Sequence, residues 1–386
     1  NEGKRFSFDS LILESKVIDN NKTLTVISNE FDGAIAGDFS IRELPAAFQT
    51  FLNRYYPSYI KPSRTLIKNE NFSFVITTKN VEEYLSLIDP NLRGFNNSTV
   101  SGRINSRENL LDLNAEVPQF TYKNIRFFNT DVKGRGTLDS LIVETTVGDV
   151  YINDSLHFPQ TYARVSSAND WSQVRIQTSA SQTLNSADIA ARVQTIPQGA
   201  RIFFDPSTFE VNGKQWQIAK DGELVLSKNI VAADGVRIFS DDQEVVVATV
   251  PSATGNTNDI QVTLRKINLG DFTPFLVKSN RIEGLFSGTV DIVDPFGKMQ
   301  VELNGETEQF RLDNDSIGRI ITGGSYNAVT GRINFNALSE NKNFNFDIKG
   351  ALAKADSTGN RELDVAGKFD HTNINFLQAY LSGIFS

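Results

Sequence analysis

Residues 268–318 constrain the fold more than any other stretch, because their side chains follow a period of two. Residues 284–293 and 298–304 each alternate between apolar and polar side chains, and the sequence Asp-Pro-Phe-Gly separates the two runs. Successive side chains of a β-strand point to opposite faces, so each run predicts a strand with one apolar and one polar face. Proline followed two positions later by glycine is typical of a tight turn. The stretch therefore predicts a β-hairpin.

The same alternation recurs along most of the chain, and the composition agrees with it. The sequence has 28 Phe against one Met and two Trp. Aromatic residues favour strands over helices. We therefore predict an all-β fold with a few short amphipathic helices, at residues 44–59, 81–88, 271–277 and 373–385. One further segment, residues 186–194, is predicted to form one or two helical turns.

The segment of residues 44–59 is the clearest of these helices. Its apolar residues recur at three- and four-residue steps, as on one side of an α-helix. This stripe is a candidate lid or plug, formed by Leu44, Phe48, Phe51, Leu52 and Tyr55.

A degenerate internal repeat joins a strand, an Asn-aliphatic pair, a short helix and a Ser-Gly strand. It begins at Asn80, at Asn268 and again at Asn373. The third copy reaches the end of the sequence unfinished, so we expect the chain to be part of a longer protein. We divide it into a first part (residues 1–250), a loop or linker (251–259) and a truncated repeat part (260–386).

A sheet with one apolar face must cover that face, and the sequence offers few helices to do so. We therefore expect an elongated, curved sheet whose apolar face lines an open hydrophobic groove. The candidate lining residues are Phe286, Val290, Ile292, Met299, Val301, Leu303, Ile333, Phe335, Phe344, Phe346 and Ile348. The residues between them are expected to face solvent, among them Ser287, Thr289, Asp291, Asn345 and Asp347.

Several runs of the sequence resemble the TamB family (translocation and assembly module), which lies within the wider AsmA-like group. These runs include NLGDFTPFL, EGLFSGTVDIVDPFGKMQVEL, GRINFNALSENKNFNFDIKG, LPAAFQTFLNRYYP and HTNINFLQAYLSGIFS, and the resemblance is clearest after Asp259. The resemblance implies a periplasmic β-groove, or β-taco, of a protein anchored in the inner membrane. It also implies phospholipid acyl chains as ligand, a TamA-like outer-membrane barrel as partner, and a role in outer-membrane assembly. The sequence contains no segment that would supply the anchor.

The sequence contains no recognisable catalytic or cofactor-binding motif. The chain has no cysteine, and its two histidines, His157 and His371, are far apart in sequence. Residues 313–318 resemble a calcium loop, but they lack its later acidic ligands and are predicted to form a turn. The net charge of −8 and the absence of a basic cluster argue against nucleic-acid binding. We therefore expect no enzyme activity, no cofactor and no metal.

Three interpretations of the function remain open at this stage. The preferred one is a non-enzymatic scaffold that conducts phospholipid between membranes. A second is a chaperone-like module that pairs its edge strands with outer-membrane proteins. A third is a structural β-solenoid whose interior is filled by its own side chains.

Overall fold

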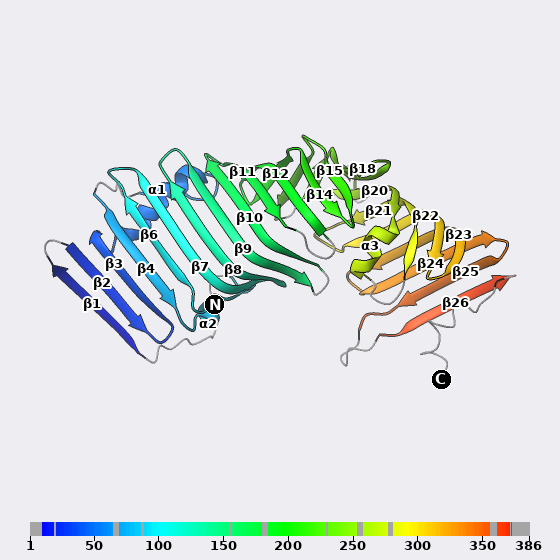
Figure 1. Ribbon diagram of the computed structural model, residues 1–386, viewed down its shortest axis with the longest axis horizontal. Coiled ribbons are helices and arrows are strands. Elements are labelled where there is room, and N and C mark those ends of the chain that lie inside the picture. Colours follow the sequence, from blue (N-terminus) through cyan, green and yellow to red (C-terminus); the bar gives the residue numbers. More distant parts are fainter. Residues whose placement is uncertain are drawn as a thin grey trace. The chain divides into compact units, whose positions relative to one another are not determined.

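The computed structural model describes residues 10–18, 21–64, 69–85, 89–153, 156–179, 184–228, 231–252, 258–276, 281–355, 361–370 and 372. In this described part the chain forms 26 strands and three short helices (Figure 1). All the described pairings are antiparallel, and the sheet is open, not closed into a barrel. The predicted all-β class is confirmed. The chain divides into two compact units, Asn1–Gly213 and Lys214–Ser386, which are described separately below.

Unit 1 contains two helices and fourteen strands among its described residues. The helices are α1 (Leu44–Tyr55) and α2 (Glu82–Leu85). The strands are β1 (Leu11–Ile18), β2 (Asn21–Ser28), β3 (Phe31–Asp38), β4 (Asn71–Thr78), β5 (Leu92–Gly94), β6 (Thr99–Asn105), β7 (Leu110–Tyr122), β8 (Ile125–Gly136), β9 (Leu141–Asn153), β10 (Leu156–Ala168), β11 (Trp171–Thr178), β12 (Leu184–Ile196), β13 (Gly199–Phe204) and β14 (Ser207–Val211).

Unit 2 contains one described helix, α3 (Leu269–Leu276), and twelve strands. The strands are β15 (Lys214–Ile218), β16 (Glu223–Ser227), β17 (Val231–Asp234), β18 (Val236–Ser240), β19 (Gln243–Val250), β20 (Asp259–Asn268), β21 (Ile282–Val293), β22 (Gln300–Leu312), β23 (Asp315–Asn327), β24 (Arg332–Asn341), β25 (Phe344–Leu352) and β26 (Leu363–Asp370).

Helix α1 begins as predicted and ends four residues earlier than expected. Pro45 occupies the first turn, where a missing N–H costs nothing, and Glu43 precedes the helix without a side-chain cap. Tyr56 leaves the helical region, with φ −134° and ψ 63°. Pro57 explains this end, because the residue before a proline avoids the helical conformation.

The prediction of a helical turn over residues 186–194 is wrong, because this segment lies within strand β12. It is rich in alanine, which favours helix, but Ala187, Ile189, Ala191 and Val193 also follow a period of two. Strand β12 pairs with β11 along its length and with β13 and β14 on its other side. Tertiary pairing therefore overrides local propensity here.

The expected linker at residues 251–259 connects two paired strands of unit 2. Val250 is opposite Asp259 in the β19–β20 pairing, so the segment joins a hairpin, and residues 253–257 lie outside the described part. The first compact unit ends at Gly213, and this segment lies within the second.

In each of the first two copies of the predicted repeat, a strand and a helix are followed by a strand that pairs with the first, although β5 intervenes in the first copy. Helix α2 follows β4 and precedes β6, which pairs with β4. Helix α3 follows β20 and precedes β21, which pairs with β20. The third copy and the helix expected at residues 373–385 lie outside the described residues.

A line of β-bulges crosses the sheet of unit 2. The pairing register shifts between Leu264 and Ile267 in β20, beside Gly284 in β21, and between Thr307 and Phe310 in β22. Lys266, Gly284 and Gln309 have positive φ angles of 48°, 141° and 52°. Bulges aligned on neighbouring strands bend the strands together, so this line marks a corner in the sheet.

The connection into α1 contains a buried carboxyl group whose titration is coupled to stability. The backbone N–H of Ser40 donates to Glu70 at 3.2 and 3.3 Å, and Glu70 is buried. Burial raises the pKa of Glu70, and the neighbouring Glu43 raises it further, while the Ser40 hydrogen bond and Lys22 lower it. The net direction is upward.

We expect this group to make unit 1 less stable as the pH rises. The folded protein binds the Glu70 proton more tightly than the unfolded chain, so the contribution is full below the ordinary glutamate pKa and is lost as the pH passes the raised value. Urea unfolding from about pH 4 to about pH 7 should show the loss in the native protein and not in Glu70→Gln. The same pH dependence in both proteins would contradict this assignment.

Candidate apolar binding face

On the Val290 side of the bulges, the paired residues that the structure describes from β19 to β26 form a sheet face with no charged side chain. The pairing registers place Val290 opposite Val262 and Leu303, and Ile292 opposite Ile260 and Val301. Further along, Leu303 is opposite Gly324, which is opposite Phe335. The other uncharged positions of this face are Val245, Val247, Leu264, Gly288, Gly305, Thr322, Tyr326, Ile333, Ala337, Ile348, Gly350, Leu352, Leu363, Val365 and Gly367. We call this surface the unit 2 apolar face.

The centre of the unit 2 apolar face is hollowed. A hollow of about 700 Å³ opens there, with walls that are almost entirely apolar. Five of the predicted candidates line it, namely Phe286, Val301, Leu303, Ile333 and Phe335. The lining also includes apolar residues that were not among the candidates, namely Leu264, Leu269, Phe310, Tyr326 and Ala337.

The remaining candidates lie on the same face but outside the hollow. Val290 and Ile292 occupy the neighbouring positions of β21, and Met299 immediately precedes β22. Phe346 is 4% exposed and belongs to a core cluster with Ile317 and Ile320. Phe344 and Ile348 pack against this cluster and are partly buried. The face thus has a protein-covered part around Phe346 and an open part around Leu303.

Phenylalanine rings lie over glycines on this face and shape the hollow. A side chain on Gly305 would lie 2.5 Å from Cζ of Phe286, and one on Gly350 would overlap the ring of Phe335. The glycines therefore let two rings lie flat against the sheet, an arrangement known to support strand glycines. Gly324 differs, since the nearest atom to an added methyl group would be the Asn334 carbonyl oxygen at 3.6 Å.

We expect Gly350→Ala and Gly324→Ala to differ in sign. The methyl group on Gly350 must displace the Phe335 ring, which should destabilise unit 2 by about 1–3 kcal/mol. The methyl group on Gly324 makes ordinary contacts, and alanine loses less conformational entropy on folding than glycine does. Gly324→Ala should therefore be neutral or stabilising by about 0.5–1 kcal/mol. Urea unfolding of the two variants checks this. Equal stabilities would mean that the Phe335 ring does not rest on Gly350.

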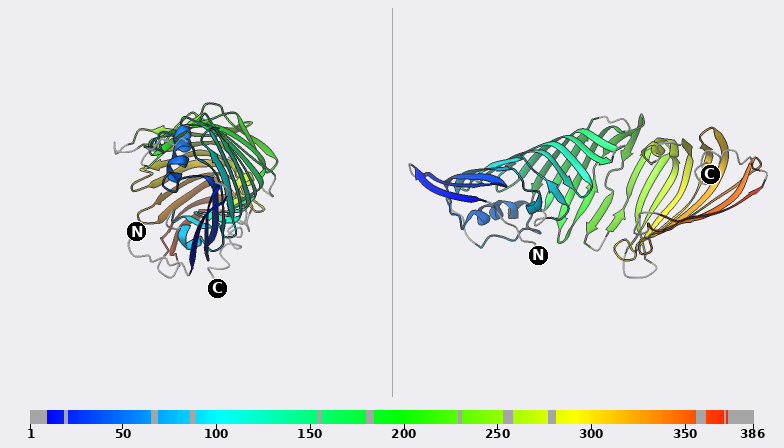
Figure 2. Two further views of the ribbon diagram at one scale, coloured as in Figure 1. Left: turned by 90° about the vertical axis from the view of Figure 1, so that its left-hand side faces the viewer. Right: turned by 90° about the horizontal axis from the view of Figure 1, so that it is seen from below.

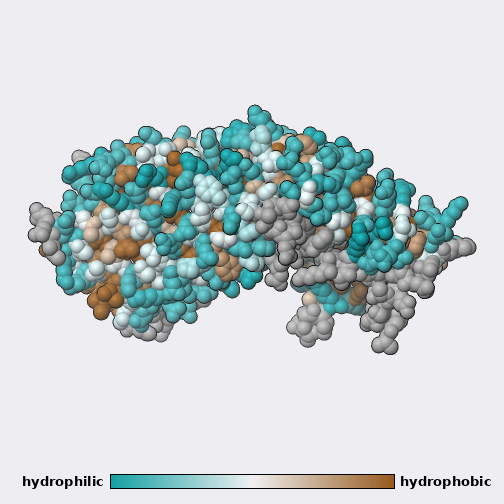
Figure 3. All heavy atoms as spheres, viewed as in Figure 1, coloured by the Kyte–Doolittle hydropathy of each residue, from teal (hydrophilic) through white to brown (hydrophobic). Residues whose placement is uncertain are grey.

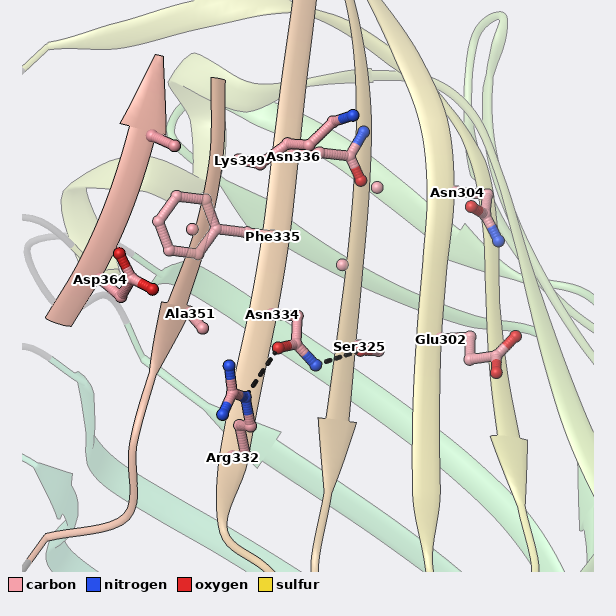
Figure 4. Close-up of a pocket in the computed structure, with 14 residues that line it drawn as sticks. Glu302, Asn304, Ser325, Arg332, Asn334, Phe335, Asn336, Lys349, Ala351 and Asp364 are labelled. Carbon is pink, nitrogen blue, oxygen red and sulfur yellow. Dashed lines mark hydrogen bonds between the residues drawn. The ribbon is translucent and has the colours of Figure 1, made fainter. Parts of the chain in front are cut away.

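The opposite face of the same strands is polar. A second hollow, of about 580 Å³, lies on this face. Its lining residues include Glu302, Asn304, Arg332 and Asn334 (Figure 4). Asn334 accepts a hydrogen bond from Arg332 Nε at 3.0 Å and donates one to Ser325 Oγ at 3.1 Å. The two faces of β22–β25 therefore differ sharply in chemistry.

The residues expected to face solvent do lie on this polar side, but they are half-buried. They are Ser287, Thr289, Asp291, Asn345 and Asp347. Each lies on a strand flanked on both sides by a paired strand, so neighbouring side chains cover part of it. Asp291, for example, accepts a hydrogen bond from Gln261 Nε2 at 2.8 Å.

The sheet of unit 1 has the same division into two faces. Its polar face carries ion pairs across neighbouring strands, such as Arg135 with Asp112 at 3.3 Å and Arg192 with Asp205 at 3.1 Å. Figure 3 shows hydrophilic side chains over much of the visible surface. The other face of this sheet carries apolar side chains such as Phe72 and Leu111. None of the groove-lining residues predicted from the sequence lies in unit 1.

Helix α1 covers part of the apolar face of unit 1 (Figure 2). Its buried residues Ala47, Phe51 and Tyr55 join a core cluster with sheet residues such as Phe72 and Leu111. The remaining candidates of the helix, Leu44, Phe48 and Leu52, are partly buried against this cluster. All five candidate lid or plug residues therefore belong to, or pack against, the cluster that α1 forms with the sheet of unit 1.

The tyrosine at the end of α1 is anchored by its hydroxyl group. Tyr55 is fully buried, and its hydroxyl donates to the Thr137 carbonyl oxygen at 2.5 Å. Burial raises the pKa of Tyr55 above its ordinary value. This tyrosine is a neutral packing residue and not an acid or base.

Among the residues that the structure describes, no group of three or more His, Cys, Asp or Glu is placed to hold a metal ion. His157 contacts Asp149 at 3.1 Å and stacks on Tyr151. Among the described residues, no helix is long and apolar enough to cross a membrane.

Comparison with protein-family models, with curated proteins and with solved structures finds no match to this chain. The structure defines the class of protein as an open antiparallel sheet with one apolar face. The family resemblance stays a hypothesis.

Proposed function

We propose that this protein is a non-enzymatic scaffold that binds the acyl chains of phospholipids along its apolar sheet face. The observation that carries the proposal is the unit 2 apolar face with its hollow of about 700 Å³. An acyl chain offers no hydrogen bond and no charge, so a surface that receives it needs neither. On the Val290 side of the bulges, the described registers from β19 to β26 place no charged side chain on this face.

The chemistry of the two faces supports the same proposal. Monomeric proteins rarely expose large contiguous apolar patches unless the patch binds something. A side chain such as Leu303 or Phe335 in the hollow is only partly covered by protein. Covering it with an acyl chain would release about 25 cal/mol for each Å² removed from water.

The wider setting that we propose follows from the sequence resemblance. In that setting the chain is a periplasmic part of an inner-membrane-anchored protein, conducts phospholipid toward the outer membrane and supports outer-membrane assembly. A TamA-like outer-membrane barrel would be its partner, with contacts outside this chain. The apolar face is compatible with this setting.

A liposome transfer assay tests the conducting role. Donor vesicles with a self-quenched fluorescent phospholipid are mixed with acceptor vesicles, and the purified chain should accelerate dequenching. The Asn304→Asp variant, altered on the polar face, serves as control and should transfer equally well. Transfer no faster than in the absence of protein would count against conduction and leave lipid binding to be measured separately.

A second candidate function, strand pairing with other proteins, is supported by the edge strands. Within the described residues β1 pairs only with β2, and β26 pairs only with β25. Leu13 and Val17 of β1, and Leu363 and Val365 of β26, are all more than half exposed. Such edges accept an added strand readily. Protection of β26 amides from hydrogen exchange by an unfolded outer-membrane protein would favour this candidate.

A further inference from the structure

On the apolar face of unit 1, side chains that are opposite one another on neighbouring strands form rows across the sheet. Only some of these rows lie under α1. The covered rows include Phe72, Ile104, Leu111 and Leu141, which belong to the core cluster beneath the helix. The adjoining row contains Ile35, Phe74, Leu113 and Val143, which pack against this cluster, and the row beyond it has no member in the cluster. This open row consists of Gly33, Ile76, Val100, Ala115, Val132, Thr145, Ala163, Ile176 and Ile189.

The open row is uncharged throughout and partly exposed to solvent. Ile76 is 39% exposed and Ile176 is 40% exposed, although both are large and apolar. The adjoining positions on the other face carry charges, such as Lys133 beside Val132 and Arg164 beside Ala163. Only an occupant without charge along its length complements this row.

Helix α1 is a fixed wall beside the open row. The Asp170 carboxylate accepts hydrogen bonds from Ser58 N at 3.0 Å and from Ser58 Oγ at 2.7 Å, just beyond the helix. The N–H groups of Asn169 and Asp170 donate to carbonyl oxygens of the last helical turn, at 3.0 and 2.8 Å. These contacts tie the helix end to the turn between β10 and β11. The helix is therefore part of the folded unit.

One side of α1 faces the open row. The Phe48 ring of α1 packs edge-on against Phe74, with ring centroids 5.6 Å apart. Phe74 is two residues before Ile76 on β4, which corresponds to about 7 Å along the strand. Helix α1 therefore contacts the row next to the open row.

We infer that the acyl chains bound by unit 1 lie in single file along the open row, beside α1 and across the strands. This inference rests on the proposed function and adds where, and in what number, the chains lie. Nine strands contribute to the row, so at about 4.8 Å between neighbours it is about 38 Å long. A chain that fills half of a hydrocarbon core of about 30 Å spans about 15 Å, so the row would hold about two chains end to end.

Cysteine scanning tests this inference cleanly, because the chain contains no cysteine of its own. Three small residues of one strand, β10, differ only in their surroundings. Ala163 lies in the open row, Ser167 is 1% exposed and hydrogen-bonded to the Tyr56 hydroxyl at 2.8 Å, and Ser166 lies on the polar face. In unit 2, the Ala337 side chain lies on the apolar face at the hollow, whereas the side chain of the adjacent Asn336 lies on the opposite face, at the polar hollow of Figure 4.

Each single-cysteine variant is labelled with a small bimane fluorophore and mixed with phosphatidylcholine that carries a nitroxide on its acyl chain. We expect Ala163→Cys and Ala337→Cys to be quenched several-fold more than Ser166→Cys and Asn336→Cys. Ser167→Cys should not react with the label in the folded protein, because α1 covers it. Circular dichroism confirms that each variant is folded.

The outcomes separate this inference from the proposed function. Quenching at Ala337→Cys but not at Ala163→Cys would overturn the open row and keep lipid binding in unit 2. Quenching at neither position would overturn both. Labelling and quenching of Ser167→Cys would show that α1 leaves the sheet, so the single-file row would be wrong. A spectral change at Ala163→Cys that grows with protein concentration without lipid would identify a second copy as the occupant.

Discussion

Replacing Leu303 with aspartate should weaken acyl-chain binding by about 100-fold or more and leave the protein folded. Leu303 lines the hollow and is partly exposed, so water can hydrate the new carboxylate while the hollow is empty. An acyl chain that enters must strip this water from a charged group, which costs at least a few kcal/mol. Equilibrium titration with a fluorescent fatty acid measures the loss, and circular dichroism checks the fold.

The neighbouring position supplies the matched control for this variant. Asn304 follows Leu303 on β22, is exposed and faces the polar hollow of Figure 4. Asn304→Asp adds the same charge one residue away and should leave binding unchanged. Unaltered binding by Leu303→Asp would show that acyl chains do not pass over β22. Unfolding of Leu303→Asp would instead show that this part of the face is a closed core.

Replacing Phe51 of α1 with alanine should destabilise unit 1 by about 3–5 kcal/mol. Phe51 is 3% exposed and lies in the core cluster between α1 and the sheet. Its truncation leaves a cavity and loses the free energy gained by removing the ring from water. Arg54 on the exposed side of the same helix is the control, and Arg54→Ala should cost well under 1 kcal/mol. Urea unfolding provides both values.

The same variant distinguishes a fixed wall from a movable lid. A lid that opens freely makes little contribution to stability, so Phe51→Ala would leave unfolding unchanged while increasing lipid access. That result would contradict the assignment of α1 as part of the folded unit. The loss of several kcal/mol that we expect fits the hydrogen bonds between the helix end and residues 169–170.

The alternation of side chains was enough to predict the fold class and many of the face residues. Counting by two from Val301 correctly leads to Leu303, because the β21–β22 ladder is regular there. The β12 segment shows where composition misleads, since its alanines suggested a helix although its alternation indicated a strand. Local propensity yielded to pairing with β11, β13 and β14.

The bulges explain why other lining residues could not be found from the sequence. Counting by two from Thr307 leads to Gln309, yet the bulge there brings Phe310 into the hollow instead. In β20 the same count leads to Lys266, and the bulge places buried Ile267 opposite Phe286. A bulge depends on the pairing of neighbouring strands, so no single-strand pattern reveals it.

The open row of unit 1 was missed for a different reason. Its members alternate correctly within each strand, but the row exists only across nine strands. Which row α1 covers depends on packing between residues far apart in sequence, such as Phe51 and Leu111. The sequence predicted the helix and its apolar stripe, and the structure was needed to show which rows remain open.

Native mass spectrometry of the purified chain tests the central claim most directly. If the apolar face binds acyl chains, the spectrum should show the 386-residue chain with added masses of phospholipid, and Leu303→Asp should carry less of them than Asn304→Asp. Detergent-free purification from cells and mild ionisation keep such lipids bound. A spectrum of lipid-free protein for the native chain, even after incubation with phospholipid vesicles, would contradict the account.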